Sequence, residues 1–218
     1  MRPSSFEKKL PGQTDVPLLD RDESILAFNE RVLDWAKRPE VPLLERLRYL
    51  CIVSSNLDEF FEVRADLHMS AFRSDETKGP YRKDTFHSLY EHARLVVNEQ
   101  YRLYNDVLLP KLQKQGIRIL SHGERTSAQR KWVSEYFQRE VRPLLVPVGL
   151  DPAHPFPQVA NKSLNFIVHL KGKDAFGRSN EIAIVKVPRV LPRLIRVPDR
   201  LCGGGVAFVL LSSLIRAH

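Results

Sequence analysis

Apolar residues recur at helical spacing along the first half of this chain. The first series directly follows Ser24, whose side chain can cap a helix. This helix should end before Pro39, because a residue that precedes a proline avoids the α conformation. Pro42 suits the first turn of a second helix, and the apolar spacing of that helix continues into residues 56–64. The first apolar series consists of Ile25, Phe28, Val32 and Trp35.

A polar loop over residues 74–80 separates these helices from a longer apolar series. That series begins at Phe86 and ends at Val107, so it predicts a long helix. Pro110 should bend or end the helix early, and Gly116 can form its C-terminal stop. Helices of this kind suffice for a small bundle. We therefore assign residues 1–116 to a helical N-terminal domain.

After Gly116 the spacing becomes a mixture of strand and helix patterns. A helix should begin at Thr126 or Ser127 and end at Val141, and a proline-rich connector follows it. The next two strand-like runs should form a hairpin, since a turn-rich stretch joins them. The strand-like runs cover residues 117–120, 164–170, 182–187 and 206–211.

These patterns predict an α+β chain, in which an all-α helical bundle is followed by a partial α/β domain over residues 117–218. The last residues have the pattern of the first turns of a helix. Because natural domains seldom stop at such a point, we expect the sequence to be a fragment of a longer protein.

Charge is distributed unevenly between the two halves. Up to Gly116 the chain has 18 Lys and Arg against 19 Asp and Glu, and from Ile117 onward it has 16 against 7. The whole formal net charge of +8 therefore belongs to the second half. Such asymmetry is typical of a unit adapted to a polyanion, such as nucleic acid or phosphate, or to an acidic partner. A solvated basic surface is the alternative.

Membrane-spanning and secreted proteins are excluded by the apolar pattern. No apolar run reaches the roughly 18 residues that a membrane span needs, which leaves only peripheral association with a membrane. The basic N-terminus is followed by no apolar stretch, so it is not a secretory signal. Cys51 and Cys202 lie far apart and indicate reduced thiols in a cytoplasmic protein.

Motifs for self-contained chemistry are absent from the sequence. It contains neither a phosphate loop nor a dinucleotide fingerprint, and Gly203-Gly-Gly205 indicates a flexible turn because no Lys-Ser/Thr pair follows it. The seven histidines lack the spacing of a zinc site, and neither cysteine has a second ligand nearby. We therefore assign no catalytic residue and no metal ligand.

Small polar residues interrupt the apolar pattern at Ser54-Ser55-Asn56. Within a helix such residues lower stability and leave polar groups to be satisfied. The Asn56 amide offers a donor and an acceptor, the pair that matches an adenine edge. Alternatively, Asn56 and Glu59 have the spacing of a capping box, as do Ser55 and Asp58, and the physics of the residues alone favours a cap. The neighbouring acids indicate a solvated helix face; they are Asp58, Glu59 and Glu62.

Several blocks of sequence resemble bacterial polyphosphate kinase, the first of two unrelated kinase types. In the first half the resemblance is carried by Phe28-Asn-Glu-Arg-Val-Leu33, Pro42-Leu-Leu-Glu-Arg-Leu-Arg48 and Ser55-Asn-Leu-Asp-Glu-Phe-Phe-Glu-Val-Arg64. In the second half, which resembles the "head" domain of that family, it is carried by Asp151-Pro-Ala-His-Pro-Phe-Pro157, Asn161-Lys-Ser-Leu-Asn165 and Val187-Pro-Arg-Val-Leu-Pro-Arg193. The resemblance spans nearly the whole chain.

This resemblance implies an ATP:polyphosphate phosphotransferase, which moves the γ-phosphate of ATP to a histidine and then, reversibly, to the end of a polyphosphate chain. The family's phosphorylated histidine, its second active-site histidine and its Mg²⁺ site lie in two C-terminal domains that resemble phospholipase D. No segment of this sequence resembles those domains, so His122, His154 and His169 do not correspond to the phosphorylated histidine. We expect the 218-residue chain alone to be inactive.

What the resemblance carries over to this chain is ATP binding, because the family's ATP-contacting asparagine matches Asn56. It also implies that the partners are ATP and inorganic polyphosphate, that Mg²⁺ serves the full-length enzyme without binding this segment, and that the full-length protein is a homo-oligomer. Ile25 stands where many members have Trp, which alters packing but no known site.

The competing hypothesis is a non-catalytic, basic protein that binds nucleic acid or another polyanion. Such a protein needs aromatic residues interleaved with Lys and Arg on one face. The second half shows little of that pattern, so we expect no specific nucleic-acid partner.

Overall fold

The computed structural model describes residues 20–74, 83–150, 155–172 and 181–218. The chain divides into two compact units, Met1–Lys111 and Leu112–His218. The domain boundary expected from the sequence, at Gly116, lies shortly after this division. Each unit is described below by itself.

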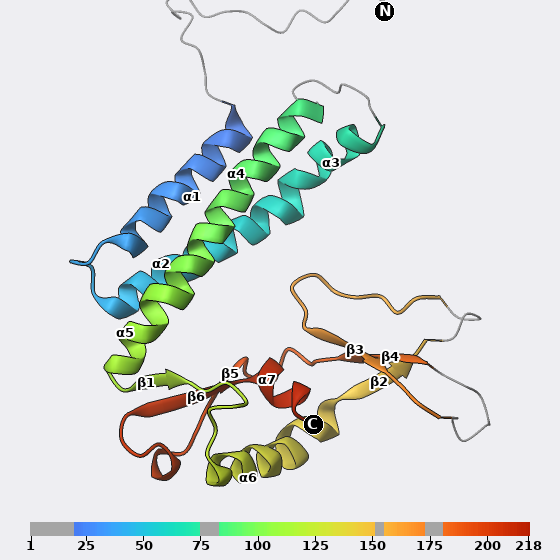
Figure 1. Cartoon of the computed structure of the whole chain (residues 1–218). Helices are drawn as coiled ribbons and strands as arrows, with labels where there is room; N and C mark the ends of the chain where they lie inside the picture. Colours follow the sequence, from blue (N-terminus) through green and yellow to red (C-terminus); the bar gives the residue numbers. More distant parts are fainter. Residues whose placement is uncertain (1–19, 75–82, 151–154, 173–180) are drawn as a thin grey trace, which may run out of the picture. The chain divides into compact units, whose positions relative to one another are not determined.

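All the regular elements among the described residues of the first unit are helical, as the predicted fold class requires. Figure 1 shows α1 and α4 as long neighbouring helices, with the rod formed by α2 and α3 beside them. Its helical elements are α1 (Arg21–Lys37), α2 (Leu43–Glu59), the π-helical turn η1 (Phe60–Arg64), α3 (Ala65–Ser74), α4 (Lys83–Arg102) and the π-helical segment η2 (Leu103–Leu108), and α5 (Leu109–Lys114) follows across the division.

The core of this unit lies where the apolar stripes of α1, α2 and α4 meet. Its members are fully or almost fully buried, and burying one Leu side chain contributes about 1.5–3 kcal/mol. Arg46 of α2 is also buried, and its Nε donates a hydrogen bond to the Ala36 carbonyl at the end of α1. The most central members are Leu26, Leu33, Ala36, Val53, Ala93 and Leu108.

The N-terminal cap of α1 differs from the prediction. Asp20, not Ser24, is the cap residue, because its carboxylate accepts hydrogen bonds from the backbone N–H groups of Asp22 and Glu23. Ser24 lies within the first turn, where its hydroxyl donates to the Asp20 carbonyl. The helix therefore begins earlier than its apolar residues do.

Pro110 does not end the long helix, which continues to Lys114. The segment η2 precedes the proline, and the N–H of Leu109 bonds the carbonyl of Tyr104, five residues back. A proline ring clashes with the carbonyl four residues before it, and a π turn widens the helix at that point. This local widening explains why the expected early end is absent.

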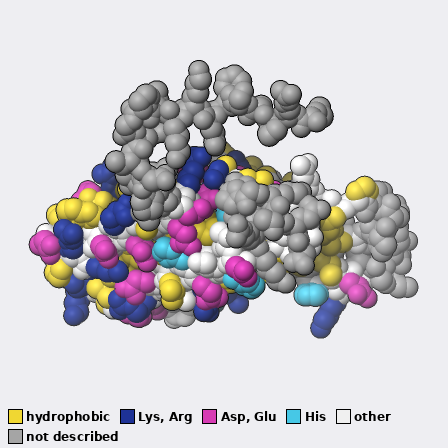
Figure 2. Space-filling view, turned by 90° about the horizontal axis from the view of Figure 1, so that it is seen from above, with side chains coloured by type: hydrophobic (Ala, Val, Ile, Leu, Met, Phe, Trp, Pro, Cys, Tyr) yellow, Lys and Arg dark blue, Asp and Glu magenta, His cyan; other side chains and the backbone are white. Residues whose placement is uncertain are grey.

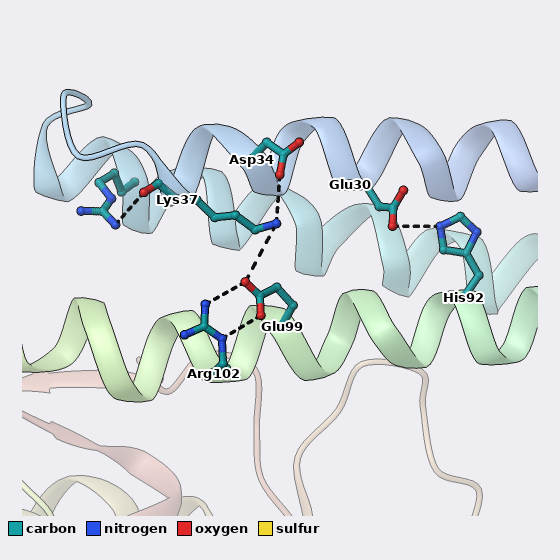
Figure 3. A network of polar contacts seen from close by, with 7 residues as sticks. Glu30, Asp34, Lys37, His92, Glu99 and Arg102 are labelled. Carbon is teal, nitrogen blue, oxygen red and sulfur yellow. Dashed lines mark hydrogen bonds and ion pairs between the residues drawn. The ribbon is translucent and has the colours of Figure 1, made fainter.

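Ion pairs connect α1 to α4 along one side of the first unit (Figure 3). Lys37 Nζ lies 2.9 Å from Asp34 Oδ1 and 3.9 Å from Glu99 Oε1, and Glu99 also pairs with Arg102. His92 of α4 lies between two glutamates of α1, with Nδ1 2.8 Å from Glu23 Oε2 and Nε2 3.3 Å from Glu30 Oε1.

The described residues of the second unit form two three-stranded sheets. In the first, β6 lies between β1, to which it is parallel, and β5, to which it is antiparallel; in the second, β4 lies between β2 and β3, antiparallel to both. The elements are β1 (Ile117–Ile119), α6 (Ser127–Tyr136), the π-helical turn η3 (Phe137–Val141), the 3-10 turn η4 (Arg142–Leu144), β2 (Val146–Gly149), β3 (Asn165–His169), β4 (Ile182–Lys186), β5 (Leu194–Arg196), the 3-10 turn η5 (Asp199–Leu201), β6 (Val206–Leu210) and α7 (Leu211–Arg216).

Most of the elements expected in the second half are present. The hairpin is formed by β3 and β4, and α6 begins with a capping box between Thr126 and Gln129. Strands β2 and β5 were not expected. Strand β2 contains Pro147 within the proline-rich connector, and this is tolerated because β2 is an edge strand, where one N–H is not needed for pairing. The connector residues 151–154 lie outside the described residues.

Two glycines meet where β6 begins. Val206 N–H donates to the Gly116 carbonyl at 2.7 Å, and both Gly116 and Gly205 have positive φ, 78° and 76°. A Cβ on Gly205 would overlap the Gly116 carbonyl oxygen. The glycines at 203–205 thus form a tight turn that packs against Gly116, where the sequence indicated only a flexible one.

Acidic and basic side chains are interspersed on the face drawn in Figure 2, where no broad field of one charge forms. Among the described residues, none of the helices is long and apolar enough to cross a bilayer.

Candidate functional site

Asn56 lies inside a continuous helical path. Helix α2 passes directly into η1 and then into α3, so no helix begins or ends at this residue. A cap requires backbone N–H groups that lack helical partners, whereas here the N–H of Phe60 bonds the carbonyls of Asn56 and Leu57. The interpretation of Ser55 and Asn56 as helix caps is therefore wrong.

A second asparagine, Asn29 of α1, holds the Asn56 side chain. Asn56 Nδ2 donates a hydrogen bond to Asn29 Oδ1 at 2.9 Å. Asn29 is 0% exposed, so water does not compete for this bond. Within the described part of the chain, Asn56 Oδ1 accepts no hydrogen bond. The amide of Asn56 is thus oriented by its nitrogen and keeps its oxygen available for a ligand.

A pocket of about 360 Å³ opens beside this pair of asparagines. Its polar lining comes from three elements: Arg21 and Asn29 on α1, Asn56 and Glu59 on α2, and Arg64 at the end of η1. The ring of Phe28, which is 50% exposed, lies in its apolar wall together with Ile25, Phe60 and Val63.

A buried carboxylate fixes Arg64 at the pocket. Asp22 is 4% exposed; its Oδ1 accepts from Arg64 Nε at 2.8 Å, and its Oδ2 lies 2.8 Å from His68 Nε2. Burial acts to raise the pKa of Asp22, but the hydrogen bonds and positive charges of Arg64 and His68 outweigh burial, so this pKa lies below its ordinary value. Asp22 therefore stays ionised at neutral pH and holds the Arg64 guanidinium in one position.

The lining of this pocket offers hydrogen-bond donors, acceptors and an aromatic ring to a ligand. Guanidinium groups match phosphate oxygens, an amide oxygen accepts from an exocyclic amine, and an aromatic ring offers a surface for a base. Among its lining residues there is no histidine, serine, cysteine or lysine that could serve as a nucleophile.

Other residues considered in the sequence form no such site. Asp58 and Glu62 are exposed, and of the three neighbouring acids only Glu59 lines the pocket. Among the described residues, no three His, Cys, Asp or Glu side chains are arranged to hold a metal ion. His122 and His169 lie in the second unit, His154 lies outside the described residues, and both cysteines are free thiols.

The residues that position Asn56 were not found from the sequence, although one signal pointed to them. Asn29 stands three residues after Leu26 and four before Leu33, both buried on the apolar stripe of α1. A polar residue at a core position needs a partner, and here the partner is the candidate site residue. Asp22 precedes Leu26 by four residues and shows the same pattern.

Two protein-family models match the chain. One is the "Polyphosphate kinase N-terminal domain", which matches residues 18–120, and the other is the "Polyphosphate kinase middle domain", which matches residues 128–218. Together they cover most of the sequence, and the first contains every residue of the Asn56 pocket.

Individual relatives agree with these matches. Over 209 residues the chain is 50% identical to a polyphosphate kinase of Neisseria meningitidis serogroup B, and over 204 residues it is 49% identical to one of Paraburkholderia phytofirmans. Each comparison covers 92% of this chain and 30% of the relative. The crystal structure of polyphosphate kinase from Porphyromonas gingivalis superposes with a TM-score of 0.78 at 29% identity, over 94% of this chain and 30% of that protein. The chain thus spans about 30% of the length of its relatives.

Proposed function

Because the chain belongs to the polyphosphate kinase family, we propose that it supplies part of the ATP site of an enzyme that makes inorganic polyphosphate from ATP. In this reaction the γ-phosphate passes from ATP to a histidine and then to the end of a polyphosphate chain. In this proposal the histidine and the Mg²⁺ ion belong to other domains of the enzyme. We therefore assign binding, and not bond making, to the residues described here.

Within this proposal, Asn56 contacts the adenine of ATP. Its Oδ1 accepts a hydrogen bond from the exocyclic amine of the base, while Asn29 keeps Nδ2 turned away. The positive charges of Arg21 and Arg64 favour an anionic ligand, and the Phe28 ring offers a face for the base. The single observation that carries the proposal is the bond from Asn56 to the buried Asn29, because it fixes the amide and frees its oxygen.

The second unit completes this proposal in two respects. We assign to it a role in the association of enzyme copies, and we infer that its basic excess favours the approach of polyphosphate. We place the reaction in the cytoplasm, where ATP is available.

The test is ATP kinetics of Asn56→Ala in a polyphosphate kinase that contains this chain. We expect kcat/KM for ATP to fall by an amount equivalent to about 1–3 kcal/mol, the range for the loss of a well-placed polar contact. Asn98→Ala is the matched control, because Asn98 is an exposed helical amide of the same unit. Unchanged kinetics with a lowered melting temperature in Asn56→Ala would assign a purely structural role to this residue.

A further inference from the structure

We infer that the second unit contains a binding site for phosphate oxyanions, built from the hydroxyl of Ser213 and the exposed side chains of Arg216 and His122, with the buried guanidinium of Arg125 hydrogen-bonded to Ser213. This inference does not depend on the role proposed for Asn56, which lies in the other unit. It rests on a cavity, on the polar side chains that line it, and on a buried cation without an ionic partner that is hydrogen-bonded to one of those side chains.

Arg125 is a buried charge with too few partners. It is 2% exposed, and its Nη2 donates a hydrogen bond to Ser213 Oγ at 2.6 Å. Its Nε is buried and has no hydrogen-bond partner, and no carboxylate of the described residues forms an ion pair with it. Burial lowers the pKa of Arg125. A buried cation is costly unless it is paired, so a protein that keeps one gains from an anion that binds there.

The backbone that follows Arg125 is held in place by hydrogen bonds. Thr126 follows directly and caps α6 through its capping box with Gln129. The Gln129 side chain is itself buried and donates to the Leu201 carbonyl at 2.8 Å. The guanidinium is therefore positioned before any ligand arrives, which reduces the entropic cost of binding.

A cavity of about 730 Å³ adjoins the partner of Arg125. Ser213 lines this cavity and links it to the buried guanidinium, and Arg216 and His122 lie at its exposed rim. Among the described residues, neither Arg216 nor His122 forms an ion pair. Serine hydroxyls, an imidazole and a guanidinium all donate hydrogen bonds to phosphate oxygens. The remaining polar lining residues are Ser121 and Ser212.

The electrostatic balance at this cavity is positive. Glu124 is the acidic residue of the same loop, and its Oε2 accepts a hydrogen bond from the Ser121 backbone at 2.8 Å. This hydrogen bond, together with the positive charge of Arg118, lowers the pKa of Glu124, which therefore contributes one negative charge to this loop. The same positive charges act on His218. Burial, and then the charges of Arg125 and His122, lower the pKa of His218.

The ligand class follows from these groups. Cationic and hydroxyl donors without a free carboxylate select a multivalent oxyanion, and a guanidinium matches the oxygens of a phosphate. The cavity volume lies in the range of small-molecule sites, so several linked phosphate groups fit as well as one. Inorganic phosphate, short polyphosphate and the triphosphate of ATP share this chemistry.

The test is isothermal titration calorimetry of the 218-residue chain with inorganic phosphate, tripolyphosphate and ATP in separate arms. We expect tripolyphosphate to bind and Arg216→Gln to weaken that binding roughly tenfold, since a charge-assisted hydrogen bond is lost. Ser213→Ala should also weaken the binding of tripolyphosphate.

Arg130→Gln is the matched control, because this substitution removes the same charge from an exposed arginine of α6. Arg125→Lys, checked by thermal melting, tests the buried group, and Arg216→Gln and Ser213→Ala carry the test if that variant does not fold.

The three arms identify the source of the oxyanion. Binding of tripolyphosphate that is stronger than that of inorganic phosphate assigns linked phosphates to the cavity, and equal affinities assign a single phosphate group. ATP binding that is lost in Asn56→Ala and retained in Arg216→Gln assigns ATP to the first unit and leaves the inference intact. The absence of tripolyphosphate binding, or an equal loss in Arg130→Gln and Arg216→Gln, would overturn it.

Discussion

At the scale of single residues, the important contact is one between two asparagines that lie on different helices. From the sequence, Asn56 could be chosen only through the resemblance of its surroundings to a known family, because its residue pattern alone suggested a helix cap. Its partner Asn29 was not predicted. Hydrogen bonds between side chains 27 positions apart depend on how two helices are packed, and periodicity does not determine that packing.

A double-mutant cycle tests whether Asn29 acts through Asn56. We expect Asn29→Ala to lower kcat/KM for ATP by raising KM, because the Asn56 amide loses the acceptor that orients it. Adding Asn29→Ala to Asn56→Ala should cost little more than Asn56→Ala alone, so the coupling between the two sites should be about 0.5–3 kcal/mol. Additive losses in ATP kinetics would show that Asn29 acts by another route.

At the scale of elements, α1 and α4 are joined by charged side chains as well as by their apolar stripes. Burial acts to lower the pKa of His92, but Glu23 and Glu30 outweigh burial, so this pKa lies above its ordinary value. A histidine whose pKa is raised by folding stabilises the folded state most at a pH where it is protonated in both the folded and the unfolded state. Its contribution is therefore present below the unfolded pKa of about 6.5 and is lost as the pH rises through the folded pKa.

The first unit should accordingly lose stability as the pH rises from about 6 to 8. The contribution of His92 should not exceed about 1 kcal/mol, because the site is partly open to solvent. The measurement is urea unfolding across this range for the wild type and His92→Gln, with His87→Gln as the control for an exposed histidine of the same helix. A pH dependence that is equal in the wild type and His92→Gln would refute the assignment.

The turn that leads into β6 gives a second prediction for an element. Gly204 and Gly205 both have positive φ, 99° and 76°, but a Cβ on Gly204 meets open space, whereas a Cβ on Gly205 meets the backbone of Gly116. Gly204→Ala should cost about 1 kcal/mol from backbone strain. Gly205→Ala should cost more, by roughly 2 kcal/mol or above, because it also separates β1 from β6. Thermal melting of both variants checks this; equal losses would show that the close approach is unimportant.

Elements with strong periodicity could be predicted from the sequence, and two short strands, β2 and β5, could not. Helix α6 and the β3–β4 hairpin have clear signals in their caps, alternation and turn residues. Strand β5 has three residues, too few for any alternation, and β2 contains a proline that argues against a strand. Both strands exist because neighbouring strands pair with them, which is a tertiary effect.

At the scale of the whole molecule, the contrast in charge between the halves coincides with a contrast in sites. The nearly neutral first half contains a pocket of mixed charge around Asn56, and the basic second half contains the cavity lined by Ser213, the hydrogen-bond partner of Arg125. The sequence predicted the charge contrast and the α+β class. It could not place the two cavities, because each is lined by residues from distant parts of its own unit.

The measurement that tests the central claim most directly is the equilibrium affinity for ATP of a polyphosphate kinase that contains this chain and carries Asn56→Asp. This substitution places a negative charge beside the bound nucleotide, and Asn98→Asp adds the same charge to an exposed position of the same unit. We predict that Asn56→Asp weakens ATP binding by about tenfold or more, with an unchanged melting temperature, and that Asn98→Asp leaves the affinity unchanged. Equal affinities in the wild type and both variants would contradict the assignment of Asn56 to the ATP site.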